Sequence, residues 1–288
     1  MKILSKGGGK RVYYDGHVHT PFCPHGSNDT FEKYIERAIS LGIEGISFTE
    51  HAPLPKNFAD PAPAKDSAML YSDLHHYFQK LQELKKTYQK FITIKTGLEI
   101  DFIEGYELET EQLLREVWPE LDDAILSVHF LQIEGKYFCM DYDENVFKEM
   151  VRKSGSLASV YKQYFSAVEK SVKHSFNSFH PLRIGHITLA KKFQKLFPAD
   201  FSMEEEINNI LLNISERGMS LDYNGAGVVK PFCGEPYPPS WIIKEAHKRK
   251  IPLVYGSDAH SAKGLGQGLE QLEPYAKLTS PLLLDRAK

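Results

Sequence analysis

The stretch Asp15-Gly16-His17-Val18-His19, which closes an apolar run beginning near Val12, decides how the rest of the chain is interpreted. Side chains alternate along a strand, so two histidines two residues apart point to the same face and can bind one ion. Neutral imidazole is a ligand for zinc, manganese and iron. The stretch therefore predicts a metal site at the end of a first strand.

Five further apolar runs end in the same kinds of side chain. They close with Thr49-Glu50-His51, Gly97-Leu98-Glu99, Ser127-Val128-His129, Arg183-Ile184-Gly185-His186 and Gly256-Ser257-Asp258-Ala259-His260. Asp258 and His260 repeat the spacing of His17 and His19, and His25 follows in the loop after the first run. A fold that gathers strand ends would collect these side chains into one pocket for several ions.

Stretches with helical periodicity separate the apolar runs, and this alternation predicts parallel strands covered by helices. Asp29 is expected to cap the first helix, with Glu32 three residues later, and Gly42 is expected to end it. The expected strands are 12–14, 43–48, 91–98, 124–130, 182–187, 219–223 and 252–255, and the expected helices are 30–41, 70–88, 106–117, 157–176, 203–216 and 240–248. These elements make about seven β/α units.

The placement of the ligands favours a closed barrel over an open sheet. An open sheet would spread six strand ends along a line at roughly 4.8 Å per strand, whereas a ring brings them near one point. We therefore expect an α/β fold, a TIM-like barrel, with the metal site at the C-terminal face of its strands. Residues 1–11 are expected to be a short polar N-terminal segment, and residues 12–288 a single barrel domain.

Composition excludes several classes of partner. The 288 residues carry a net charge of −3, from 35 basic and 38 acidic side chains, which argues against binding to nucleic acid. No apolar run reaches the roughly 18 residues of a membrane span, and the N-terminus lacks the apolar core of a signal peptide. Cys23, Cys139 and Cys233 form no Cys-x-x-Cys pair, which suits a reducing compartment. We expect a cytoplasmic protein without a membrane partner.

Several other histidines have no neighbouring ligand. They fall in expected helices or at helix ends, where a structural histidine is more common than a metal ligand. We expect these to be surface or core residues: His75, His76, His174, His180 and His247.

Taken together, these residues resemble the polymerase and histidinol phosphatase (PHP) superfamily, whose members are distorted (β/α)7 barrels with up to three divalent metals. The resemblance covers about residues 14–266. Longer strings are similar to the Gram-positive type of histidinol-phosphate phosphatase, namely Asp15–Gly26, Phe48–Pro55, Lys65–Met69 and Cys233–Pro238. The resemblance implies a metal-dependent phosphatase of histidine biosynthesis that acts on a small phosphate monoester, L-histidinol phosphate.

The resemblance also implies three sets of ligands for zinc, manganese or iron. His17, His19, Glu99 and Asp258 would hold one ion; Glu99 would bridge to a second held by His129 and His186; His25, His51 and His260 would hold a third. All nine positions are filled here. Arg183 matches a phosphate-binding arginine, and Lys230 is left as a second phosphate contact because Val229 stands where an arginine is expected.

The chemistry of a phosphate monoester sets the expected roles. The dianion repels nucleophiles and its alkoxide leaves poorly, so a catalyst must neutralise charge and supply hydroxide at neutral pH, as clustered ions can. We expect Glu99 to lie beside the attacking water, Arg183 to bind phosphoryl oxygens, and Asp258 or His260 to assist proton transfer. A Cys or Ser nucleophile is not required.

The ammonium and imidazole of the substrate would need carboxylates in addition to those that bind metal. Asp101, Glu235 and the acids of segment 53–69 are candidates for binding its ammonium or imidazole. Asp101 and Glu50 could instead orient metal-bound histidines. The proline-rich segment 53–69 is long for a βα loop, and we expect it to close over the substrate as a lid.

Three other functions compete with the phosphatase. A phosphodiesterase or exonuclease of the same superfamily would need a basic groove, which the near-neutral charge does not supply. A scaffold without metals would show gaps among the ligands. A metal-dependent amidohydrolase also begins with His-x-His, but it gives no reason for Glu50-His51 or Asp258-Ala259-His260.

Overall fold

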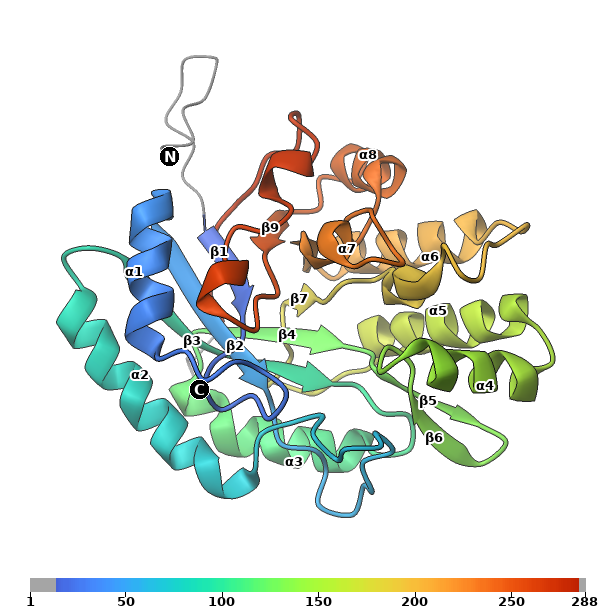
Figure 1. Cartoon of the computed structure of the whole chain (residues 1–288), viewed down its shortest axis with the longest axis horizontal. Helices are drawn as coiled ribbons and strands as arrows, with labels where there is room; N and C mark the ends of the chain where they lie inside the picture. The colour runs from blue at the N-terminus through green and yellow to red at the C-terminus, as the bar shows by residue number, and fades with distance from the viewer. Residues whose placement is uncertain (1–13, 285–288) are drawn as a thin grey trace.

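Seven parallel strands form one sheet that curls into a nearly closed barrel in the computed structural model, which describes residues 14–284 (Figure 1). Each strand pairs in parallel with the next along the sheet. In sheet order the strands are β1 (Tyr14–Val18), β2 (Gly45–His51), β3 (Thr93–Asp101), β4 (Asp123–Ser127), β7 (Arg183–Ile184), β8 (Ser220–Asn224) and β9 (Leu253–Gly256). The predicted TIM-like barrel is confirmed, while the predicted segment 1–11 and the start of the first strand lie outside the described residues.

The first and last strands of the sheet meet at their C-terminal ends. Asp258 N donates to His17 O over 2.7 Å, and His19 N donates to Ala259 O over 3.0 Å. Val18 and Ala259 form a parallel bridge. Figure 1 shows β1 and β9 side by side. The ring therefore closes through the residues that carry the predicted ligands.

Helices cover the outside of the barrel, and their apolar faces follow helical spacing. The longest one buries Val160, Tyr164 and Val168 against the sheet. The helices are α1 (Phe31–Leu41), α2 (Leu74–Tyr88), α3 (Glu107–Val117), α4 (Glu144–Ser154), α5 (Leu157–Lys173), α6 (Glu204–Glu216), α7 (Ala226–Val229) and α8 (Ser240–Lys248). All six predicted helices are present; α8 has the predicted bounds, and the other five differ at one end.

The cap of α1 differs from the prediction. Thr30, not Asp29, is the N-cap residue, and its side chain accepts a hydrogen bond from Lys33 N. The carboxylate of Asp29 instead accepts from Ala262 N over 3.1 Å. Asp29 therefore links α1 to the loop after β9, a long-range contact that local capping rules do not reveal.

The structure contains elements that were not predicted, chiefly a hairpin and a helix after β4. The expected strand 124–130 ends at Ser127, and the chain then forms an antiparallel hairpin, β5 (Phe130–Ile133) and β6 (Lys136–Cys139), followed by α4. Its turn residues Glu134 and Gly135 both have positive φ, at 50° and 77°, as a tight two-residue hairpin requires. This hairpin lies outside the barrel sheet and returns the chain to the C-terminal face.

Segment 53–69 packs against the hairpin through a small apolar cluster of its own. Phe58 and Ala62 are buried in it together with Ile103, Phe130 and Cys139. The segment is thus anchored in the structure rather than detached from it. Across residues 14–284, no helix has the length and apolar character needed to cross a bilayer.

Candidate metal centre

The structure brings the predicted ligands together at the C-terminal face of the barrel. They come from the ends of six strands and from the loops that follow. Three groups of donor atoms lie close enough to hold an ion: His17, His19 and Glu99; Glu99, His129 and His186; and His19, Cys23, His51 and His260. Asp258 and His25 lie beside the first and third groups, as described below.

The first group centres on one oxygen of Glu99. Its Oε2 lies 3.2 Å from His17 Nε2 and 3.5 Å from His19 Nε2. Asp258 Oδ1 lies 3.1 Å from His19 Nε2 and 3.8 Å from His17 Nε2. Two imidazoles and two carboxylates therefore converge, and this is a donor set that suits zinc or manganese.

The second group uses the other oxygen of the same carboxylate. Glu99 Oε1 lies 2.8 Å from His186 Nε2 and 3.7 Å from His129 Nε2. Ser127 Oγ also donates to Glu99 Oε1, over 2.6 Å. Because its two oxygens face different histidine pairs, Glu99 has the geometry of a bridging ligand between two ions.

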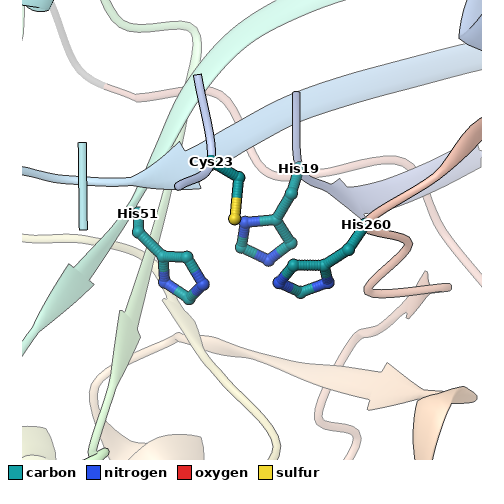
Figure 2. Close-up of side chains that lie close together, drawn as sticks. All are labelled: His19, Cys23, His51 and His260. Carbon is teal, nitrogen blue, oxygen red and sulfur yellow. The ribbon is translucent and has the colours of Figure 1, made fainter. Parts of the chain in front are cut away.

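The third group contains a residue that was not predicted. Figure 2 shows Cys23 beside the imidazoles of His19, His51 and His260, all directed toward one space. The ring of the predicted ligand His25 stacks on that of His260, with centroids 4.9 Å apart. The structure therefore offers both a thiol and an imidazole from the Cys23–Gly26 turn to this group.

Carboxylates fix the orientation of three of the histidines. Asp222 Oδ2 lies 2.8 Å from His17 Nδ1, and Asp101 Oδ1 lies 2.7 Å from His129 Nδ1. Each contact occupies Nδ1 and leaves Nε2 facing Glu99, the arrangement by which outer carboxylates orient metal-bound histidines. Asp101 therefore orients His129, which was the predicted alternative to binding the substrate.

Glu50 acts on His19 in the same way. Its Oε1 lies 3.2 Å from His19 Nδ1, and its Oε2 accepts from Thr20 N and Thr20 Oγ1.

The role of Asp222 was missed in the sequence, where the only signal was an acidic residue inside the apolar strand 219–223. Asp222 is fully buried at the barrel centre.

Burial and neighbouring charges raise the pKa of some histidines in the site and lower that of others. At His19, burial disfavours the charged imidazole, but hydrogen bonds to Asp258 and Glu50 outweigh it and raise the pKa to about 9. At His51 and His260, burial and the neighbouring charge of His19 hold the pKa well below its usual value. His51 and His260 are thus neutral and ready to bind metal, whereas His19 exchanges a proton for it.

Buried atoms in the cluster show that a metal fits. His17 Nε2, Glu99 Oε2 and both ring nitrogens of His51 are buried and have no hydrogen-bond partner among residues 14–284. A buried polar group without a partner is costly, and divalent cations bound in these groups would give His17 Nε2, Glu99 Oε2 and one ring nitrogen of His51 a partner. The residues present therefore suit the ions that the sequence predicts.

The predicted phosphate contact of Arg183 is contradicted by the structure. Its guanidinium is buried inside the barrel, where Nη2 donates to Asp123 Oδ2 over 2.6 Å and to Gly16 O over 2.7 Å. Asp123 is the first residue of β4, so the side chain extends toward the N-terminal end of the strands. Arg183 also does not line the cavity at the metal centre. The residue stabilises the barrel interior instead.

A cavity of about 430 Å³ opens above the metal centre. Lys230 lines it, as predicted for a phosphate contact, and so does Asp101. Glu235 does not: its carboxylate pairs with Lys191 outside the lining, which contradicts a direct substrate contact. Segment 53–69 contributes Asp66 and Ser67 to the wall.

Comparison with known proteins agrees with this geometry. The PHP domain model matches residues 15–226, most of the chain. The chain therefore belongs to the PHP domain family. Among its relatives, the histidinol-phosphatase of Bacillus subtilis (strain 168) is 49% identical over 260 residues, which cover 89% of this chain and 96% of that protein.

Solved structures show the same fold. The crystal structure of HisK from Listeria monocytogenes is 39% identical, with a TM-score of 0.86, and the match covers 90% of this chain and all of that one. The histidinol phosphate phosphatase of Lactococcus lactis, solved with zinc, L-histidinol and phosphate, is 21% identical, with a TM-score of 0.65 over 88% of each chain.

Proposed function

We propose that this protein is a metal-dependent histidinol-phosphate phosphatase, which hydrolyses L-histidinol phosphate to L-histidinol and phosphate in histidine biosynthesis. The observation that carries the proposal is the placement of the two oxygens of Glu99, one beside His17 and His19 and the other beside His129 and His186. The 49% identity to the B. subtilis histidinol-phosphatase over nearly its whole length supports the choice of substrate.

The proposed cofactors are up to three divalent ions of zinc, manganese or iron. When bound, such ions lower the pKa of a coordinated water and neutralise charge on the phosphoryl oxygens. The zinc in the L. lactis relative supports this assignment. The proposed ligands are His17, His19, His25, His51, Glu99, His129, His186, Asp258 and His260.

The side chains of the site have separate proposed tasks. Glu99 joins the first two groups of ligands, and Asp101 holds His129 in the orientation that faces Glu99. Asp258 and His260 lie at the border between the ligands and the cavity, where they can accept or return a proton. Lys230, which lines the same cavity, supplies positive charge for the phosphate.

The proposed substrate indicates where the enzyme works and which partners it needs. We take residues 12–288 as a single PHP barrel domain that works in the cytoplasm. Its partner is a small phosphate monoester, and no step of the reaction requires nucleic acid or a membrane.

The test is phosphate release from L-histidinol phosphate by the purified protein, stripped of metal and resupplied with manganese or zinc. A simple phosphodiester is assayed alongside. Metal-dependent release from the monoester, with little cleavage of the diester, is expected. Cleavage of the diester with no release from the monoester would instead identify a phosphodiesterase of the same family and refute the proposal.

A further inference from the structure

The cavity above the metal centre contains an ion pair that the proposed metal chemistry does not use. Lys192 Nζ donates to Asp141 Oδ2 over 3.0 Å and also to the backbone oxygen of Asp141. Asp141 follows β6 of the hairpin, whereas Lys192 lies in the short helix η3 (Leu189–Phe193) after β7. Both residues line the cavity. Two connections far apart in the sequence thus place opposite charges in one wall.

Asp141 keeps an acceptor free for a ligand. A carboxylate offers about four lone-pair sites, and Lys192 occupies only Oδ2. Among the described residues, Oδ1 accepts only from the thiol of Cys139, at 3.5 Å, and a thiol is a weak donor. Although burial opposes ionisation, Lys192 and His129 hold the pKa of Asp141 well below its usual range, so it carries its charge.

The other carboxylates of the inner wall each hold a histidine of the metal centre. Asp101 accepts from His129, and Asp258 contacts both His19 and Asn224. Asp66, at the outer edge of the cavity, is presented by segment 53–69, and its backbone oxygen contacts His25. Asp141 differs from Asp101 and Asp258 because its carboxylate contacts Lys192 and Cys139 and no histidine of the metal centre, which leaves Oδ1 available to a ligand.

Lys192 supplies the matching positive charge. It comes six residues after the ligand His186, and its side chain is largely buried, with 18% of its surface exposed. The lysines that line the cavity are Lys192 and Lys230. Arg183 does not reach the cavity, and Val229 has no charge, so neither supplies positive charge there. The contact with Asp141 holds the Lys192 ammonium in place before a ligand arrives, which limits the entropic cost of binding.

We propose that the Asp141–Lys192 pair selects phosphate monoesters that carry an ammonium two carbons from the ester oxygen. Lys192 binds a phosphoryl oxygen while Asp141 Oδ1 accepts a hydrogen bond from the ammonium. A paired carboxylate and ammonium match the adjacent anion and cation of such a substrate and repel neither. The inference rests on the proposed function and deepens it, because it names the residues that recognise the charged part of L-histidinol phosphate.

The test compares two monoesters, L-histidinol phosphate and its analogue without the amino group, 3-(imidazol-4-yl)propyl phosphate. For Asp141→Asn, kcat/KM for the amino substrate should fall about 10- to 100-fold, the usual value of a hydrogen bond to a charged group. The analogue should change little with this variant. For Lys192→Met, the inhibition constant of inorganic phosphate should rise about 10-fold. Lys191→Met, whose wild-type side chain pairs with Glu235 outside the cavity, is the matched control and should resemble the wild type.

Zinc content and melting temperature, measured for every variant, separate recognition from damage to the fold. Equal losses on both monoesters in a folded, fully metallated Asp141→Asn protein would overturn the inference. A selective loss in Asp66→Asn instead would also overturn it and assign the ammonium to segment 53–69. A wild-type protein that hydrolyses neither monoester would refute the proposed function itself, which is a different result from lost discrimination by an active enzyme.

Discussion

Three histidines of the first two ligand groups, His17, His19 and His129, have a carboxylate against the ring nitrogen that faces away from Glu99. His17 and His129 hold Nδ1 against Asp222 and Asp101, and their Nε2 atoms face Glu99. An imidazole held in this way keeps the correct tautomer and loses little freedom when metal binds. Affinity for metal therefore resides partly in residues that never contact the ion.

Replacing Asp222 with Asn tests this at His17. The amide keeps the size of the side chain but removes its charge, so zinc affinity should fall about 10- to 100-fold. Titration against a chromophoric chelator measures the change. Asp200→Asn, at an exposed position, is the matched control. Unchanged zinc affinity in Asp222→Asn would show that His17 is oriented by the strand alone.

His180 gives the protein a pH dependence that is separate from the metal centre. Burial, followed by the charges of Arg217 and His174, lowers its pKa from 6.5 to about 4. Below pH 6.5 the unfolded chain binds a proton that the folded chain rejects, so the free energy of unfolding falls as the pH drops toward 4. Between pH 7 and pH 5 this residue should cost about 2 kcal/mol.

Denaturant unfolding of the wild type and of His180→Phe, at both pH values, measures that cost. The variant should lose about 2 kcal/mol less than the wild type on going from pH 7 to pH 5. His247→Phe, at an exposed position, should retain the wild-type difference. Parallel behaviour of all three proteins would contradict a buried neutral His180.

Individual ligands were predictable because they occupy strand ends, where the pattern of the sequence is strongest. Asp222 and Arg183 were not, since both lie in the barrel interior and their partners depend on how the ring closes. Arg183 meets Gly16 and Asp123 from other strands, 167 and 60 residues away in the sequence. No local pattern contains that information.

Among the elements, six of the longer helices were predicted, whereas α4 and the short irregular pieces were not. α8 has the predicted bounds, because its apolar positions repeat over two turns. β7 contains only two residues, and the hairpin β5–β6 replaces what was expected to be the end of a strand. Hydrogen bonding between neighbouring strands of the barrel sets where such strands end. Periodicity within one segment of the sequence does not indicate those ends.

Segment 53–69, which the sequence predicts to be a lid, packs against the hairpin and forms part of the cavity wall. The ring of Phe58 makes edge contacts with Tyr106, Phe130 and Tyr137, at centroid distances of 5.1, 5.1 and 5.0 Å. Asp60 accepts from Ser67 N and Ser67 Oγ, which fixes the part that reaches the cavity. Phe58 therefore packs the segment against three aromatic rings.

Phe58→Ala should release this wall. Removing the ring costs about 3–5 kcal/mol of local stability, because the small cluster cannot collapse around the gap. Limited proteolysis within the segment should become faster, and KM for the phosphate monoester should rise more than kcat falls. Phe91→Ala, at a position 69% exposed, is the control that removes the same ring without effect. Equal protease resistance in both variants would show that the segment is held by other contacts.

At the scale of the whole molecule, closure of the barrel and assembly of the metal centre are the same event. β1 and β9 are joined through His17, Asp258, His19 and Ala259, and three of these are proposed ligands. The core and the site therefore share one set of backbone hydrogen bonds. A change that opens this seam should cost both stability and metal affinity, whereas a change at a single ligand should mainly affect the metal.

Gly256 is the position where this coupling can be tested. A Cβ atom there would lie 2.4 Å from Asp222 Oδ1 and 2.5 Å from His17 Cβ, closer than real atoms approach. Because both neighbours are buried, Gly256→Ala should push β9 away from β1 and lower the free energy of unfolding by about 2–3 kcal/mol. Zinc affinity should fall in the same variant, since His17 and Asp258 move apart. Gly264→Ala, whose added atom meets nothing nearer than 3.3 Å, is the control. Thermal unfolding with and without zinc reports both effects, and lower stability with unchanged zinc affinity would show that the seam and the metal centre are independent.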